Sequence, residues 1–488
     1  MQRPNGSRSH ACGHRSWAVL FNSFEFVVFA VVFFLAWHLL RGWKKWRWSF
    51  LIAASFFFYG WWDWRYLFLL IYTGTIDFTA GLAMERYPHR KKIILGVSLF
   101  GNVGSLAIFK YLGFATSSVN TVLHLFGLQY QLPVHNLILP IGISFYTFES
   151  LSYTIDVYKG LVKPTRDILQ FFSFLSLFPH LVAGPVIRPY DLMPQIDADR
   201  RPTDQQKWDG LWLIAHGLFK KMVIADTLAP VVNSAFAAAV PTQSAAYWWV
   251  VTTMFAAQIY CDFSGYTDIA RGLAKWMGYE FPLNFNHPYI SGSIREFWSR
   301  WHISLSTWFR DYVYIPLGGS KKGNFAGHKN MWITMIVSGL WHGAAWHFVI
   351  WGALHAFYLS VERVTRWPDR LKGIRGGRAI STVTLLILVW VAWVFFRATT
   401  TAQACQVVSL MFNVHALGLD ALGSVRAPAL AVLLIAFCRE FYLYHGWDSA
   451  PIWESKLARG LEPVAIALIF VACVYLRGPG NAFIYFQF

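Results

Sequence analysis

Residues 331–359 read MWITMIVSGLWHGAAWHFVIWGALHAFYL, an apolar and aromatic stretch without Asp, Glu, Lys or Arg. It belongs to an apolar run over 331–362, and about 20 largely apolar residues suffice for an α-helix to cross the hydrocarbon core of a bilayer. Three histidines interrupt the stretch, at positions 342, 347 and 355. Because a polar side chain at membrane depth must find a hydrogen-bond partner or water, the stretch predicts a membrane helix with satisfied or functional imidazoles.

Comparable apolar runs recur along the whole chain. Their lengths predict an all-α polytopic membrane protein with roughly eleven transmembrane helices. Residues 168–187 are apolar as well, but Pro179, Gly184 and Pro185 break the pattern, so we expect a re-entrant or broken helix there. The runs lie at 20–40, 48–62, 64–84, 93–113, 137–158, 210–235, 244–270, 331–362, 381–397, 426–444 and 461–477.

The composition also indicates a membrane protein. Hydrophobic residues make up 56% of the 488 positions, charged residues make up 14%, and the mean hydropathy is +0.40, whereas a soluble chain is about 25% charged. The formal net charge of +17 comes from short basic runs between apolar segments. Such runs are typical of cytoplasmic loops beside anionic lipid, so we expect contacts with membrane lipids and no nucleic-acid binding. The positive-inside rule places residues 41–47, 85–92 and 159–166 in the cytoplasm.

The first residues do not fit this orientation. Arg3, Arg8 and Arg15 would lie on the outer side of the membrane, against the positive-inside rule. We therefore expect residues 1–19 to be a non-native or mis-started, disordered leader. Residues 20–488 are expected to form a single membrane domain.

Polar residues at membrane depth concentrate between positions 258 and 355. Asp262 and Asp268 are six residues apart, on different faces of one expected helix. At most one of them could face a polar cavity unless the helix breaks at Gly265. A solvated helix end explains the two carboxylates equally well.

Residues 293–312 form a second polar segment. Aromatic residues recur there at helical spacing, and His302 and Arg310 lie together towards another face. The segment is too polar to span a membrane, so we expect it to lie in the interface or to dip into it. It would be either a surface anchor or the lining of a cavity.

His342 is the candidate for chemistry. It stands in GLWHGAAW, residues 339–346, where Gly and Ala allow a substrate or another backbone to approach closely. A lone helical histidine is more often a hydrogen-bonded packing residue, but imidazole is also the side chain best suited to proton transfer near neutral pH. No metal is expected, because His342 and His347 are five residues apart and the five cysteines form no CxxC pair.

Four motifs together resemble the membrane-bound O-acyltransferase family: REFW (295–298), WHISLS (301–306), FRDY (309–312) and GLWHG (339–343). The resemblance extends to the C-terminal FIYFQF (483–488) and fits best the bacterial branch of the alginate O-acetylases and the teichoic-acid D-alanyl transfer proteins. It implies transmembrane and re-entrant or interfacial helices around a central funnel. It also implies an invariant histidine at His342 and a second functional position at His302.

The resemblance further implies an acyltransferase that moves acetyl to hydroxyls of an extracytoplasmic, alginate-like polysaccharide. His342 would be the general base, and His302 would orient the acceptor or share its proton. The expected donor is cytoplasmic acetyl-CoA, with no cofactor bound. Arg295 and Arg310 would contact the donor phosphates or, as we favour, pair with the neighbouring carboxylates of Glu296 and Asp311. The remaining candidates for substrate binding are Trp341, Asp311 and Asp262.

The implied location is the bacterial inner membrane, where extracytoplasmic acetyltransferase proteins would be partners that complete transfer to the polymer. Two other functions stay open. One is D-alanyl transfer to teichoic acid from a carrier protein. The other is transport of a polysaccharide precursor, which predicts internal repeats.

Overall fold

The computed structural model of the chain describes residues 21–446, apart from 136, 183 and 199, and residues 456–486. Within these ranges every regular element is a helix, so the expected all-α class is confirmed. The leader expected at 1–19 lies outside the described residues.

The helices are listed here in chain order. The α-helices are α1 (Phe24–Leu39), α2 (Lys44–Asp63), α3 (Leu67–Arg86), α4 (Lys91–Leu106), α5 (Leu112–Leu125), α6 (Ile143–Lys159), α7 (Ile168–Leu175), α8 (Phe178–Leu181), α9 (Pro189–Asp197), α10 (Asp204–Leu218), α11 (Asp226–Ala237), α12 (Ala245–Met277), α13 (Ile294–Arg300), α14 (Ile303–Phe309), α15 (Asn324–His342), α16 (Trp346–Thr365), α17 (Trp367–Leu371), α18 (Gly377–Arg397), α19 (Thr401–Met411), α20 (Ala427–Tyr444) and α21 (Lys456–Tyr475). Three π-helical segments are η3 (Ala107–Tyr111), η4 (Phe219–Ala225) and η6 (Arg310–Tyr314). Short 3₁₀ helices are η1 (Trp64–Tyr66), η2 (Pro88–Arg90), η5 (Pro288–Ile290), η7 (Val414–Ala416), η8 (Leu419–Ser424) and η11 (Ile484–Phe486).

Several of these helices are suited to a bilayer. Among the described residues, the stretches long and apolar enough to cross it are Lys44–Arg86, Pro88–Leu125, Gly377–Arg397 and Ala427–Tyr444. Other expected crossings coincide with helices that are shorter, such as α10, or richer in polar residues, such as α12. By length and composition alone, the count of about eleven crossings is therefore not confirmed. The segment 168–187 is broken into α7 and α8, as its prolines predict.

Two pairs of glycines bring α10 and α12 into backbone contact. A Cβ atom at Gly217 would lie 2.5 Å from the carbonyl oxygen of Gly265, and one at Gly265 would lie 2.7 Å from that of Gly217. About two turns further along α12, a Cβ atom at Gly272 would lie 2.5 Å from the carbonyl oxygen of Gly210. Small residues at a helix contact allow this approach, which replaces the hydrophobic driving force that lipid removes. Gly265 therefore provides close packing and does not break α12, contrary to the break considered from the sequence.

The run 331–362 is not one helix. α15 ends at His342, and α16 begins at Trp346 after an extended Gly343 (φ −159°, ψ 149°). A Cβ atom at Gly343 would lie 2.0 Å from the ring of Phe348, so only glycine lets the chain fold back this tightly. His342 thus lies at the end of a helix, and the expectation of a mid-helix imidazole is wrong.

The segment 293–312 is likewise interrupted. His302 adopts a left-handed backbone conformation (φ 43°) and separates α13 from α14. Arg310 belongs to η6, so His302 and Arg310 do not share one continuous helix face as expected.

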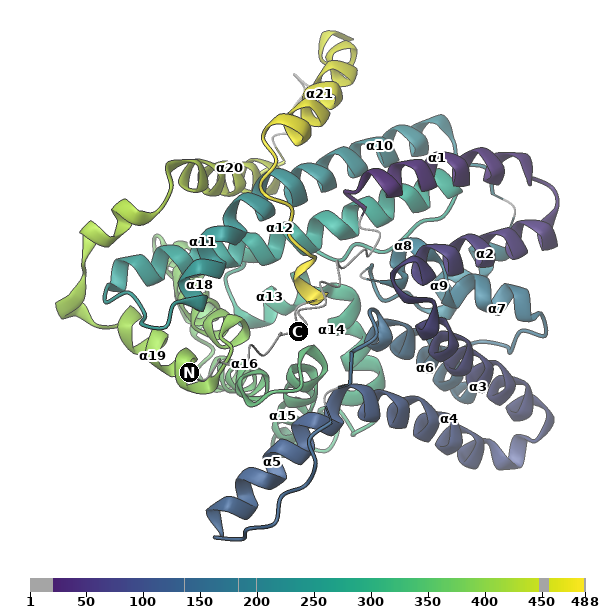
Figure 1. Ribbon diagram of the computed structural model, residues 1–488, viewed down its shortest axis with the longest axis horizontal. Helices are drawn as coiled ribbons and strands as arrows, with labels where there is room; N and C mark the ends of the chain where they lie inside the picture. The colour runs from purple at the N-terminus through teal and green to yellow at the C-terminus, as the bar shows by residue number, and fades with distance from the viewer. Residues whose placement is uncertain (1–20, 136, 183, 199, 447–455, 487–488) are drawn as a thin grey trace, which may run out of the picture.

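The chain returns to its own centre at the C-terminus. Figure 1 shows α21 and α5 projecting from the helical body, and the yellow segment after α21 running back to its middle, near α13 and α14. The side chains of Phe483 and Ile484 are buried there. We call residues 478–486 the C-terminal segment.

Candidate active site

His342 lies on the wall of a cavity of about 800 Å³. The side chain is 6% exposed, and its ring lies 5.0 Å from that of Trp341 and 5.7 Å from that of Tyr485, measured between centroids. We call this space the His342 cavity. Its wall also includes Lys110 and Ser144. An open space therefore reaches the imidazole, as a role in catalysis requires.

The end of α15 is fixed by side chains from η3. The Lys110 ammonium donates to the carbonyl oxygens of Trp341 and His342, the latter at 3.3 Å, and to Ser144 Oγ at 3.4 Å. The Tyr111 hydroxyl donates to the carbonyl oxygen of Leu340 at 2.8 Å. These carbonyls lack partners within the helix, so the two side chains hold the last turn in place. Sequence reasoning missed Lys110, although a single lysine in the otherwise apolar run 93–113 was a usable signal.

His302 is fully buried and held by one acceptor. Its Nδ1 lies 3.2 Å from Asn284 Oδ1, which also accepts hydrogen bonds from the Ser304 amide and hydroxyl at 3.1 and 2.9 Å. Because Asn284 Oδ1 is the acceptor, Nδ1 carries the proton and Nε2 keeps its lone pair. The His302 ring lies 6.3 Å from that of Trp341 and 6.4 Å from that of Tyr485. The two predicted histidines thus flank the same pair of aromatic rings.

Trp341 and the two predicted histidines each have a buried polar atom without a protein partner in the described part of the chain. These atoms are Trp341 Nε1, His342 Nδ1 and His302 Nε2. His347, by contrast, has its Nδ1 3.0 Å from the carbonyl oxygen of Phe395. Trp341 and His342 line the His342 cavity, whereas His302 is fully buried and does not line it. Buried polar groups are normally satisfied, so each of the three atoms has capacity for a further hydrogen bond.

A second cavity, of about 1140 Å³, lies towards the other end of α15. We call it the arginine cavity because Arg295, Arg310, Arg363, Arg366 and Arg378 contribute to its wall. Its wall also includes Ser338 of α15, one helical turn before His342. The last turn of α15 therefore separates the two cavities.

The expected ion pairs of the FRDY and REFW motifs are found in part. Arg310 Nε lies 2.7 Å from Asp311 Oδ1, as predicted. Glu296 does not pair with the neighbouring Arg295 but with Arg300 and Arg378, each at 3.1 Å. Arg295 is exposed on the wall of the arginine cavity.

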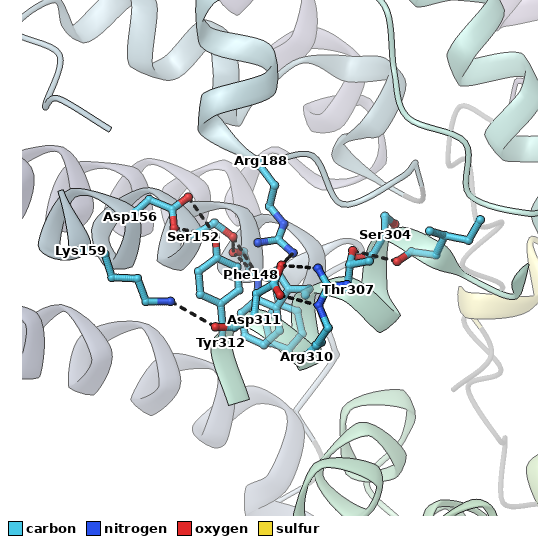
Figure 2. Close-up of polar contacts among 12 residues, drawn as sticks. Phe148, Ser152, Asp156, Lys159, Arg188, Ser304, Thr307, Arg310, Asp311 and Tyr312 are labelled. Carbon is cyan, nitrogen blue, oxygen red and sulfur yellow. Dashed lines mark hydrogen bonds and ion pairs between the residues drawn. The ribbon is translucent and has the colours of Figure 1, made fainter. Parts of the chain in front are cut away.

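Asp311 joins three parts of the fold (Figure 2). Its Oδ2 lies 3.1 Å from an Arg188 nitrogen, and its carbonyl oxygen accepts a hydrogen bond from Lys159 at 3.1 Å. The next residue, Tyr312, donates its hydroxyl to Asp156 at 2.9 Å and packs beneath the Arg188 guanidinium, 4.5 Å from the ring centroid. These contacts place Asp311 in a structural network between α6, α9 and η6.

Asp262 forms a buried ion pair with Lys221 at 2.9 Å. Asp268 pairs with Lys220 at 2.6 Å. The expectation that only one of these carboxylates could find a polar environment in an unbroken helix is wrong, because consecutive lysines of η4 reach both. The lysines lie in an expected span and were not singled out from the sequence.

Comparison with known proteins places this arrangement among acyltransferases. Residues 161–402 match the model of MBOAT, the membrane-bound O-acyltransferase family. The chain is 38% identical over 502 residues to the probable alginate O-acetylase AlgI of Pseudomonas putida, covering 96% of this chain and 100% of that protein. It is 32% identical over 439 residues to the peptidoglycan O-acetyltransferase of Helicobacter pylori, with coverages of 83% and 82%. It is 28% identical over 266 residues to the teichoic acid D-alanyltransferase of Bacillus subtilis, with coverages of 52% and 67%.

Proposed function

This chain belongs to the membrane-bound O-acyltransferase family and is an acyltransferase, and we propose that it O-acetylates an extracytoplasmic polysaccharide with His342 as the general base. The named acetyl-transferring relatives support the polysaccharide acceptor, since they are called alginate O-acetylases and a peptidoglycan O-acetyltransferase. The transporter alternative loses support because the relatives are acyltransferases.

The position of His342 between two cavities carries the proposal. One cavity reaches the imidazole directly, and the other ends one turn away along α15. An acyltransferase that joins a donor and an acceptor from opposite sides of a membrane needs two such entrances. In this arrangement the acceptor hydroxyl occupies the His342 cavity, and the donor thioester approaches past Ser338.

The proposed reaction is balanced in atoms and protons. The imidazole of His342 removes the proton of the acceptor hydroxyl while the oxygen attacks the thioester carbonyl carbon. The C–S bond then breaks, the acetyl group stays on the acceptor as an ester, and the imidazolium returns the proton to the departing thiolate. The reaction releases no net proton, so the buried base needs no proton path to bulk water.

The unpartnered atoms of Trp341 and His302 supply the remaining roles in this proposal. The Trp341 indole N–H is a donor for the substrate oxygen on which negative charge develops. His302 Nε2 is an acceptor that orients the second reactant, with its tautomer fixed by Asn284. Neither role needs a bound cofactor.

The donor in this proposal is acetyl-CoA, whose phosphates would lie in the arginine cavity. We test this donor site at Arg295, because Arg310 is already paired with Asp311. We expect Arg295→Ala to raise KM for acetyl-CoA by roughly 10–100-fold with kcat nearly unchanged, since a hydrogen bond to a charged group contributes about 1.5–3 kcal/mol. Steady-state kinetics on purified protein in nanodiscs measures this. Arg166→Ala, at an exposed arginine paired with Glu85, is the matched control, and an unchanged KM for Arg295→Ala would refute the donor site.

The proposal includes a membrane arrangement. About eleven crossings surround a central funnel that leads to His342, in the inner membrane of a bacterium. Basic loops at 41–47, 85–92 and 159–166 face the cytoplasm, where acetyl-CoA is made. Extracytoplasmic acetyltransferase proteins are the proposed partners of this chain on the outer side of the membrane.

Isotope feeding tests the transferred group. Cells that carry the gene should incorporate labelled acetate into their extracytoplasmic polysaccharide as alkali-labile ester, and cells without it should not. Labelled D-alanine is fed in parallel, because the teichoic acid D-alanyltransferases are relatives at lower identity. If the gene leads to incorporation of labelled D-alanine but not of labelled acetate, the proposed function is wrong and D-alanyl transfer takes its place.

A further inference from the structure

Three charged side chains lie together in the interior of the protein. Lys221 Nζ is 2.8 Å from Asp226 Oδ1 and 2.9 Å from Asp262 Oδ1. The three side chains are only 2–3% exposed. Removing such charges from water costs several kcal/mol per ion, so a buried cluster of this kind adds little net stability. The cluster instead forms hydrogen bonds to the backbone of the C-terminal segment.

The cluster binds the backbone of the C-terminal segment. Lys221 Nζ donates to the carbonyl oxygen of Asn481 at 3.0 Å, and Asp262 Oδ2 accepts from the Ile484 amide at 2.7 Å. At the start of the segment, the Gly478 amide donates to the carbonyl oxygen of Met222, next to Lys221, at 2.8 Å. A Cβ atom at Gly478 would lie 2.3 Å from the Asp226 backbone, so the segment is in direct backbone contact with the cluster.

The same segment forms part of the His342 cavity. Gly480, Asn481, Ala482 and Tyr485 all line it. Most of the segment has no regular structure, so its position depends on the packing of its side chains and on these few hydrogen bonds to its backbone. The ammonium and the carboxylate each select one backbone group, and so they help to specify that position.

We propose that Lys221 and Asp262 are positioning residues for acyl transfer, holding the C-terminal segment as a wall of the His342 cavity. The inference rests on the proposed role of His342. Loss of either contact lets the segment shift relative to the imidazole, and a displacement of about 1 Å in a catalytic site lowers the rate by up to about 10²-fold.

The test compares Asp262→Asn with Asp268→Asn in the full-length protein in nanodiscs. Asp262→Asn leaves Lys221 paired with Asp226, so the interior keeps a balanced pair. Asp268→Asn disturbs the neighbouring Lys220 pair on the same two elements and is the matched control. We expect kcat to fall by roughly 10–100-fold for Asp262→Asn, with KM for acetyl-CoA unchanged and with partial rescue by Asp262→Glu. Asp268→Asn should retain most of the parent rate.

Two further measurements separate positioning from general structural damage. Hydrogen exchange of the peptide containing Ile484 should be faster in Asp262→Asn and unchanged in Asp268→Asn. The asparagine side chain keeps only one acceptor oxygen, for which the Lys221 ammonium and the Ile484 amide then compete. The double variant Asp262→Asn/Tyr485→Ala should be no slower than Tyr485→Ala alone, since both act through the same segment.

The outcomes distinguish the two proposals. Three results would overturn the positioning role. They are full activity of Asp262→Asn, equal losses of activity in Asp262→Asn and Asp268→Asn, and additive losses of activity in the double variant. If Asp262→Asn fails to fold, exchange and activity of Asp262→Glu decide, and a fully active Asp262→Glu with an unprotected Ile484 amide would contradict it. Full activity of His342→Ala would instead overturn the proposed function itself.

Discussion

The variant His342→Ala should fold and insert like the parent protein but lose acyl transfer by about 10²–10⁴-fold, the usual effect of removing a general base. The imidazole lies on a cavity wall, so its removal enlarges an existing space and does not leave a void in dense packing. The loss should appear in kcat with little change in KM for the donor, because the arginine cavity is untouched. Acetyl transfer by purified protein in nanodiscs measures it.

His347→Gln is the control for this result. His347 is buried in the adjoining helix and contacts the carbonyl oxygen of Phe395, a hydrogen bond that a glutamine amide can also donate. Its activity should stay within a fewfold of the parent. Near-parent activity of His342→Ala would end the assignment of the base.

Gly217→Val should strongly impair folding. Its side chain would enter the space between α10 and α12, where the Gly265 carbonyl oxygen lies 2.5 Å from the site of a Cβ atom. Overpacking typically costs 1–3 kcal/mol and sometimes more. We expect at least about 3 kcal/mol here, because the group in the way is backbone and has no alternative rotamer. Thermal unfolding and the yield of monodisperse, detergent-solubilised protein are the measurements.

Gly96→Val provides the comparison at a helical glycine. No other group lies within 4 Å of a Cβ atom at Gly96 in α4, so the side chain would enter open space. Its yield and melting temperature should match the parent. Equal yields of the two valine variants would show that the α10–α12 contact tolerates a side chain.

The sequence predicts helices wherever apolar length decides the outcome. It also predicts the broken segment around Pro179, because proline acts locally. It does not predict the end of α15 at His342, since Gly343 lets the chain fold back onto Phe348, a residue of the following helix. A local pattern of apolar residues carries no information about that contact.

The sequence likewise predicts some residues of the candidate site and misses others. His302 and His342 were identified from motifs, and the structure brings both against Trp341 and Tyr485. Lys110 was not identified, because its role depends on carbonyl oxygens at the end of α15, 231 residues away in the chain for Trp341. The lysine stands out in an apolar run, but a single sequence does not show which distant segment it contacts.

The glycine contact between α10 and α12 also sets the angular setting of η4. Gly217 faces Gly265 one turn before the lysines begin, and a Cβ atom at Gly265 would already lie 3.3 Å from the Lys221 amide nitrogen. A slip of one residue in either helix would rotate it by about 100° and turn the Lys221 ammonium away from Asp262. The direction of the Lys221 side chain is therefore set by the contact between two glycines that have no side chain of their own.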